Sequence, residues 1–320
     1  MINSPSTQYG KIVLAIIVAI FSTSIFLSGE NYSVKATMET NNQKKIVEIT
    51  NIAHRGARSL APENTLLAAS KAYEAGADMW ETDVQFTKDR RLVLMHDDTL
   101  VRTTDVESVY PGRDSYAVSN FTLDEIKRLD AGSWFVDTDP FEQISGGKIP
   151  QPEIDRFKGV KVPALREGLE LTKRLEWKIN LEIKPVKETT NLIAKKVVRL
   201  VEEMDMEDVV VISSFDHSLV KSVSELNPGI STALLVEEPE PDILEAMRET
   251  GAQALNVAAS ALGKDRVIDT LRELKAARED YRVNVFTVNK EEHLKQLVKN
   301  SLVGGIFTDF PHRLSSILKH

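Results

Sequence analysis

Cysteine is absent from the 320 residues of this chain, which excludes disulfide bridges, thiolate metal sites and a lipoprotein anchor. Basic residues are not in excess either, since 40 Lys and Arg stand against 48 Asp and Glu. The resulting formal net charge of -8 argues against a nucleic-acid-binding protein. No Gly-rich loop follows the first strand-like run, so nothing favours a dinucleotide-binding fold. The composition, 42% hydrophobic and 28% charged, suits one large globular domain, although the length alone would allow two.

A long apolar run lies near the N-terminus. It spans residues 12–27 without a charge, follows Lys11, and precedes a polar segment in which residues 34–36 resemble a small-residue cleavage site. We therefore expect residues 1–36 to be an export signal and residues 37–45 to be a flexible polar linker. The alternative is a membrane anchor that is not cleaved, because the run approaches the ~18 residues that can span a bilayer. The expected location is periplasmic, extracellular or at the cell surface, with membrane attachment only through this segment.

After residue 45 the chain alternates between strand-like and helix-like segments. Strands are expected at 46–54, 79–86, 92–96, 178–184, 209–215, 231–236, 253–258, 282–288 and 304–308. Helices are expected at 64–75, 164–174, 189–204, 217–226, 241–250, 265–279 and 290–299. This alternation indicates a parallel sheet, and candidate functional residues at the ends of many strands favour a (β/α)8 TIM barrel over an open sheet. Residues 97–162 break the rhythm, which is typical of an insertion with its own structure, placed here after the second strand region.

The stretch from residue 51 to residue 104 carries the most chemistry. Glu81 and Asp83 are two apart on an expected strand, so they share one face, and two neighbouring carboxylates repel unless a cation lies between them. Oxygen ligands favour Ca²⁺ or Mg²⁺ over softer metals. His54 and His96 each end an apolar run, and neighbouring parallel strands would bring both to the edge that carries the metal. This arrangement suits displacement at phosphorus, where one imidazole takes a proton from the attacking oxygen and the other gives one to the leaving oxygen.

Several short motifs follow one another in a definite order and spacing. In the first half of the chain they are His54-Arg55-Gly56, Pro62-Glu63-Asn64-Thr65, Gly76-Ala77-Asp78, Glu81-x-Asp83, Thr87-Lys88-Asp89 and His96-Asp97-x-x-Leu100-x-Arg102-Thr103-Thr104. They continue with Asn180-Leu181-Glu182-Ile183-Lys184-Pro185, Ser213-Ser214-Phe215, Thr287-Val288-Asn289 and Gly305-Ile306-Phe307-Thr308-Asp309. In residues, order and spacing this set resembles the glycerophosphodiester phosphodiesterase family. The resemblance covers residues 46–320 and implies a TIM barrel domain whose insertion caps the site and helps to select substrate.

The resemblance also suggests roles for individual residues. Glu81, Asp83 and Glu182 would hold one divalent cation, and Arg55 and Lys184 would bind the substrate phosphate. On the expected strand 178–184, Asn180, Glu182 and Lys184 share a face, which is unusual for a buried strand. Four further residues are candidates for the pocket wall, with packing in the interior as the alternative: Trp134, Phe215, Asn256 and Phe286. Phe286 stands where relatives usually carry Trp.

The sequence thus predicts a metal-dependent enzyme that hydrolyses glycerophosphodiesters to sn-glycerol 3-phosphate and an alcohol, with His54 and His96 as general acid and base. Water, or the glycerol 2-hydroxyl through a cyclic phosphate, would attack. One alternative is a lysophospholipase D or another phosphodiesterase on the same fold, with a more apolar mouth. A catalytically silent binding protein ranks last, because both histidines and all three carboxylates are present.

Overall fold

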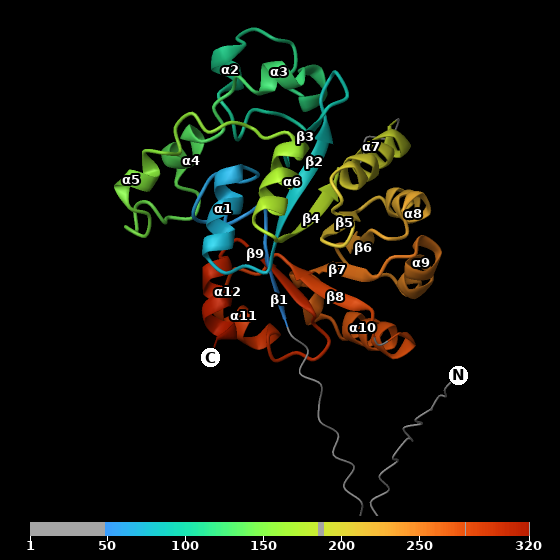
Figure 1. The fold of residues 1–320 in the computed structure, drawn as a ribbon. Coiled ribbons are helices and arrows are strands. Elements are labelled where there is room, and N and C mark those ends of the chain that lie inside the picture. Colours follow the sequence, from blue (N-terminus) through green and yellow to red (C-terminus); the bar gives the residue numbers. More distant parts are fainter. Residues whose placement is uncertain (1–48, 185–188, 279, 320) are drawn as a thin grey trace, which may run out of the picture. The chain divides into compact units, whose positions relative to one another are not determined.

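A closed barrel of eight parallel strands forms the centre of the computed structural model, which describes residues 49–184, 189–278 and 280–319 (Figure 1). Around the barrel the strands follow one another in chain order, and pairing of the first with both the second and the last closes the sheet. The parallel strands are β1 (Thr50–Ala53), β2 (Met79–Phe86), β4 (Lys178–Ile183), β5 (Val210–Ser214), β6 (Ser231–Val236), β7 (Ala254–Ala258), β8 (Arg282–Phe286) and β9 (Gly305–Thr308). The TIM barrel prediction is confirmed.

Helices surround the barrel and cover the outer face of its strands (Figure 1). The longer ones are α1 (Leu66–Glu74), α6 (Leu165–Arg174), α7 (Thr190–Glu203), α8 (His217–Leu226), α9 (Ile243–Thr250), α10 (Asp265–Ala277), α11 (Glu291–Leu297) and α12 (Pro311–Leu318). Each buries an apolar stripe against the sheet; in α6, for example, Leu165 and Leu169 are fully buried. Side-chain caps fix some of the helix starts, as where the Asp216 carboxylate accepts from the first backbone N–H groups of α8.

The insertion begins after the hairpin that β2 forms with β3 (Leu92–Leu94). It contains the short helices α2 (Val106–Val109), η1 (Val118–Asn120), α3 (Leu123–Ile126), α4 (Ser133–Thr138) and α5 (Gln151–Ile154), and a further short helix, η2 (Ala259–Gly263), follows β7. Buried apolar side chains such as Leu100, Phe121 and Leu129 give the insertion a core of its own. The insertion is thus a folded helical segment attached to one side of the barrel.

Two expectations about the elements need correction. Residues 92–96 were expected as a parallel strand of the sheet, but β3 runs antiparallel to β2, because only the short turn at residues 87–91 connects the two strands. No helix was expected after the last strand, yet α12 spans Pro311–Leu318. The expected signal or anchor at 1–36 and the linker at 37–45 lie outside the described residues. Within the described part of the chain, no helix combines the length and apolar character that a membrane span requires.

Candidate active site

A tight turn at the end of β1 places the first two candidate residues at the mouth of the barrel. Arg55 and Gly56 both adopt a positive φ, 55° and 82°. A side chain at Gly56 would meet the backbone of Ala68 at 2.6 Å, so only glycine lets this turn pack against α1. The backbone N–H of Arg55 then points inward and donates to Glu81 Oε2 at 2.8 Å. The sequence after β1 therefore ties the turn to the second strand.

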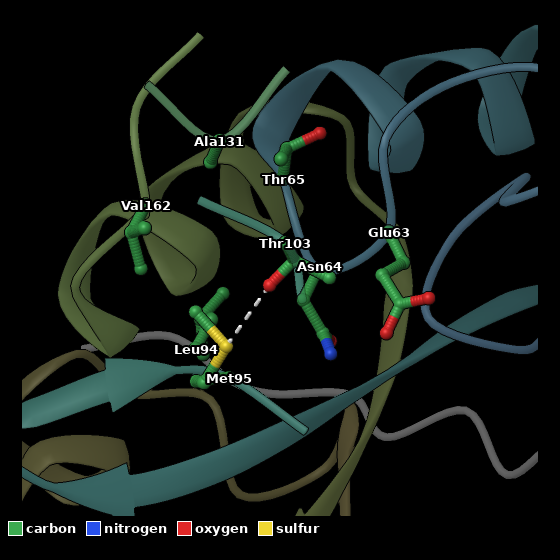
Figure 2. A pocket seen from close by; sticks show the side chains of 8 residues that line it. All are labelled: Glu63, Asn64, Thr65, Leu94, Met95, Thr103, Ala131 and Val162. Atoms are coloured by element: carbon green, nitrogen blue, oxygen red, sulfur yellow. Dashed lines mark hydrogen bonds between the residues drawn. The ribbon is translucent and has the colours of Figure 1, made fainter. Parts of the chain in front are cut away.

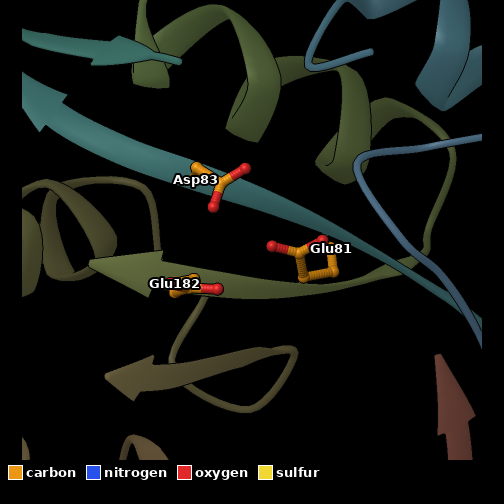
Figure 3. Close-up of side chains that lie close together, drawn as sticks. All are labelled: Glu81, Asp83 and Glu182. Carbon is orange, nitrogen blue, oxygen red and sulfur yellow. The ribbon is translucent and has the colours of Figure 1, made fainter. Parts of the chain in front are cut away.

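Three carboxylates gather on the inner face of β2 and β4 (Figure 3). The register of the two strands pairs Asp83 with Glu182, while Glu81 lies one pleat further back on the same face. One oxygen from each side chain lies within 4.8 Å of the others. Glu81 is only 2% exposed. Burial, together with the charges of Asp83 and Glu182, raises the pKa of Glu81 well above its ordinary value.

Two cations share this cluster. The Lys184 ammonium lies 2.9 Å from Asp83 Oδ1 and also contacts Glu182, and Arg55 Nε lies 3.5 Å from Asp83 Oδ2. Burial opposes the ionised form of Asp83, but Lys184 and Arg55 outweigh it and hold the pKa of Asp83 at about 2. Arg55 only partly offsets the effect of burial on Glu81, whose Oε1 is buried and has no hydrogen-bond partner among the described residues. Three carboxylates, two cations and one unpaired carboxylate oxygen fit a site for a divalent cation.

The two histidines are each anchored through Nδ1 by a carboxylate. His54 Nδ1 lies 2.7 Å from Asp309 Oδ1, directly after β9, and His96 Nδ1 lies 2.8 Å from Asp97 Oδ1. A carboxylate at Nδ1 favours the tautomer that carries a proton there and leaves Nε2 free. Burial lowers the pKa of both imidazoles, although the neighbouring carboxylates act in the opposite direction. Both histidines are therefore arranged to exchange protons through Nε2.

His96 reaches the site by a different route from the one expected. It does not stand at the end of a parallel strand; instead β2 extends past the barrel rim and β3 returns antiparallel beside it. The backbone N–H of Met95 donates to Asp83 O at 3.0 Å, which brings the next residue back to the carboxylate cluster. His96 and Asp83 are close enough for the charge of each to shift the pKa of the other. The antiparallel hairpin therefore brings His96 to the carboxylate cluster, whereas a neighbouring parallel strand was expected to do so.

A chain of ion pairs connects Asp97 and Asp309, the two carboxylates that anchor the histidines. Arg102 donates to Asp97 Oδ2 at 2.6 Å and to Glu63 Oε1 at 2.7 Å. On the other side, Arg58 lies 3.0 Å from Glu63 Oε2 and 3.6 Å from Asp309 Oδ1. Arg55 also donates to Glu63, at 2.8 Å. Glu63 is therefore the buried centre on which three guanidinium groups converge.

The loop that carries Glu63 also carries Asn64, which adopts a φ of 54°. The Asn64 amide donates to Asp83 Oδ2 at 2.8 Å and accepts from the Thr82 hydroxyl at 2.7 Å. Figure 2 shows the pocket between this loop, the end of β3 and the insertion, where Thr103 donates to the Met95 sulfur at 3.4 Å. The insertion therefore packs directly behind the loop that orients one carboxylate of the cluster.

The four candidate wall residues fall in different places. Phe286 lines a cavity together with His54, Glu81 and Glu182. The ring of Phe215 packs edge to face against the ring of Phe286, with the ring centres 6.0 Å apart. Phe215 is 43% exposed and does not itself line the cavity, so the aromatic pair connects the cavity wall at Phe286 with the protein surface.

Trp134 packs within the insertion, where its indole N–H donates to Ala131 O at 3.0 Å, and Arg102 lies 5.8 Å above its ring. Asn256 was placed at a strand end, but it lies fully buried in the middle of β7, where its side chain accepts from Asn284 at 2.8 Å. Its position corresponds to the interior alternative, because an inward side chain at mid-strand lies below the mouth of a barrel.

Sequence reasoning did not assign roles to several residues of the site: Arg58, Glu63, Asn64, Asp97, Arg102, Asn289 and Asp309. Asn289 holds Asp309 from behind, with its amide donating to Asp309 Oδ2 at 2.7 Å. Most of these residues stand within the motifs quoted above, so the sequence already marked their positions. Their roles were not marked, because a carboxylate that orients a histidine cannot be told from a turn residue without the distance between them.

Residues 54–313 match the model of the glycerophosphoryl diester phosphodiesterase family. A glycerophosphodiester phosphodiesterase of Caldanaerobacter subterraneus subsp. tengcongensis is 33% identical over 270 residues, which cover 84% of this chain and 97% of that protein. Another from Bacillus altitudinis is 34% identical over 269 residues, covering 83% of this chain and 96% of that protein.

A solved structure agrees with these matches. It is that of an Oleispira antarctica phosphodiesterase in complex with the product sn-glycerol-3-phosphate, with a TM-score of 0.70 and 27% identity, covering 84% of this chain and 96% of that one. The family model spans most of the barrel and both histidines, and the two bacterial relatives are matched over nearly their whole length. The chain therefore belongs to the glycerophosphoryl diester phosphodiesterase family and is a glycerophosphodiester phosphodiesterase.

Proposed function

We propose that the chain hydrolyses glycerophosphodiesters to sn-glycerol 3-phosphate and an alcohol by acid/base catalysis between His54 and His96. The observation that carries the proposal is that each imidazole is anchored at Nδ1 by a carboxylate while both stand beside the buried carboxylate cluster. A solved relative bound to sn-glycerol-3-phosphate supports the same product.

The proton transfers follow from the anchoring. The neutral imidazole takes a proton at Nε2 from the attacking oxygen as the new bond to phosphorus forms. The other imidazole, protonated on both nitrogens, releases its Nε2 proton to the alcohol oxygen as the old phosphorus–oxygen bond breaks. If the glycerol 2-hydroxyl attacks first, a cyclic phosphate forms and water opens it in a second step; phosphorus NMR during turnover distinguishes this route from direct attack by water.

Glu81, Asp83 and Glu182 fit a divalent cation, which we propose to be Ca²⁺ or Mg²⁺. When bound, the cation supplies positive charge that draws electron density from a phosphoryl oxygen and lowers the cost of the charge that develops there. Lys184 and Arg55 already lie at the carboxylates of the cluster and would neutralise the remaining phosphate charge from the same side.

The aromatic pair formed by Phe215 and Phe286 would form one wall for the alcohol group. Its rings offer flat apolar surface beside His54, which would exclude water from the leaving group.

For the N-terminal segment we propose export, with residues 1–36 as signal and a retained anchor at residues 12–27 as the competing outcome. Comparing the N-terminal sequence of protein secreted or retained by the producing cell separates these two.

Release of sn-glycerol 3-phosphate from glycerophosphocholine and glycerophosphoethanolamine tests the proposal. Assays with Ca²⁺, with Mg²⁺ and with chelator should show release that the chelator abolishes. Faster turnover of lysophosphatidylcholine than of glycerophosphocholine would instead favour the lysophospholipase D alternative. Failure to release any product with either metal from any of these substrates would contradict the proposed function.

A further inference from the structure

A basic groove lies on the outer side of the β2–β3 hairpin, away from the carboxylate cluster. Arg90 and Arg91 at the hairpin turn, Arg166 at the start of α6, and Lys196 and Arg199 on α7 line it, with Glu203 as the one carboxylate among its lining residues. Figure 1 shows the hairpin between α6 and α7. The chain has a formal net charge of -8, yet five cations and one carboxylate line this groove, so its local charge is positive.

The cations are held in place by contacts within the groove. Glu203 accepts from Arg199 Nε at 2.8 Å and from Arg166 at 3.0 Å, so one carboxylate positions two guanidinium groups. The Lys196 ammonium donates to the backbone carbonyl of Arg90 at 2.9 Å, which joins α7 to the hairpin turn. Glu203 neutralises one of the positive charges and holds Arg166 and Arg199 side by side, while Lys196 ties α7 to the hairpin turn.

The remaining two cations extend from the hairpin turn. The Arg90 guanidinium lies 5.6 Å above the ring of Phe86, and Arg91 lies near Asp89, whose carboxylate already accepts from the Thr87 hydroxyl and from the Leu123 backbone N–H. Both arginines are exposed to solvent. A ligand can therefore reach them without displacing a buried ion pair.

The backbone of Arg90 adopts a left-handed conformation. Its φ is 58°, a conformation that glycine adopts without cost and that strains an L residue by about 1 kcal/mol or more. Glycine in place of Arg90 would therefore relieve strain at this turn.

The floor of the groove is apolar and is formed by Leu92, Leu123 and Leu200. The cations line the groove from the hairpin turn and from helices α6 and α7, and the leucines lie among them. This arrangement suits a discrete molecule rather than a flat anionic surface, because such a molecule can enter the groove and contact cations from both the hairpin and the helices. We propose that this groove binds a soluble organic anion that carries two phosphate groups on a short carbon frame. The phosphates would pair with the hairpin arginines on one side and with Lys196 and Arg199 on the other, and the carbon frame would cover the leucines.

Fructose 1,6-bisphosphate serves as the probe, and titration calorimetry of the full-length protein in chelator at low salt gives its affinity. Arg199→Gln should weaken binding by about fivefold, which is the value of one exposed ionic contact. Arg90→Gly should weaken it by a similar factor while keeping or raising the melting temperature, because glycine relieves the strained turn. The Arg90→Gly and Arg199→Gln changes together should reduce affinity by about 25-fold.

Lys195→Gln is the matched control. Lys195 is exposed on the same helix and loses the same charge, but it does not line the groove, so its affinity for the probe should equal that of the unmodified protein. The inference is overturned if the probe does not bind at about 10 mM, which is roughly ten times a Kd of 1 mM. Equal affinity of the double variant, or an equal loss in Lys195→Gln, also overturns it. Binding to phosphatidylglycerol vesicles in place of the bisphosphate would identify a membrane-docking surface and reject the discrete ligand.

Discussion

Replacing Glu63 with glutamine tests whether this one buried carboxylate, through its arginine partners, keeps Asp97 and Asp309 in place beside the two histidines. The Glu63 side chain is only 3% exposed, accepts hydrogen bonds from Arg55 and Arg102 at 2.7 to 3.1 Å, and forms an ion pair with Arg58 at 3.0 Å. Glutamine keeps the shape of the side chain but removes its charge, so three guanidinium groups lose their shared partner. Breaking a buried ion pair by removing one member costs about 3 to 5 kcal/mol. For a domain of this size that corresponds to a melting temperature about 6 to 20 °C lower.

The loss should extend to catalysis, because Arg102 also holds Asp97, which orients His96. Loss of an outer contact of this kind lowers turnover by about 10- to 100-fold. Calorimetry and initial rates at saturating substrate measure the two effects in one preparation. The matched control is Glu203→Gln, since Glu203 also holds two arginines but is 42% exposed, and its melting temperature should hardly change. An unchanged melting temperature in Glu63→Gln, or an equal fall in both variants, would refute the reasoning.

The remaining predictions concern the chemistry of the site. His54→Ala or His96→Ala should reduce turnover by several orders of magnitude while circular dichroism shows an intact fold, and full activity in both variants would reject their roles. Glu81→Gln should weaken metal binding measured by calorimetry and reduce the stabilising effect of Ca²⁺ or Mg²⁺ on melting; an unchanged metal affinity would exclude Glu81 as a ligand. Asp309→Asn should lower kcat by about 10- to 100-fold with little change in KM, because the tautomer of His54 is no longer fixed, whereas a KM effect alone would contradict this. Burial lowers the pKa of both histidines from the ordinary 6.5, so the base stays neutral as the pH falls through that value, and the acid limb of kcat/KM should lie below pH 6.5; a limb above it would contradict the assignment.

Much of the barrel follows from local pattern. The expected strands match β1 to β9 to within two residues at their ends, except that residues 46–48 of the first expected strand lie outside the described residues. The match arises because buried strands read as short apolar runs, most of them separated by helix-length segments. The last helix, α12, was not expected, since it follows directly on β9 near the chain end with no separate signal beyond Pro311. The predicted direction of β3 was wrong, because an apolar run indicates a strand but not the neighbour with which that strand pairs.

The sequence alone determined the residue types of the site and the order in which the chain presents them. Alternation along β2 puts Glu81 and Asp83 on one face of the strand, a consequence of strand geometry that needs no tertiary information. Only the tertiary structure decided which of these groups carry a partner. The separation of 255 residues between His54 and Asp309 is closed only when β1 pairs with β9, so no local pattern could report their contact. The same closure decides ionisation, because burial and charge at a few ångströms shift the pKa of Glu81 and Asp83 in opposite directions.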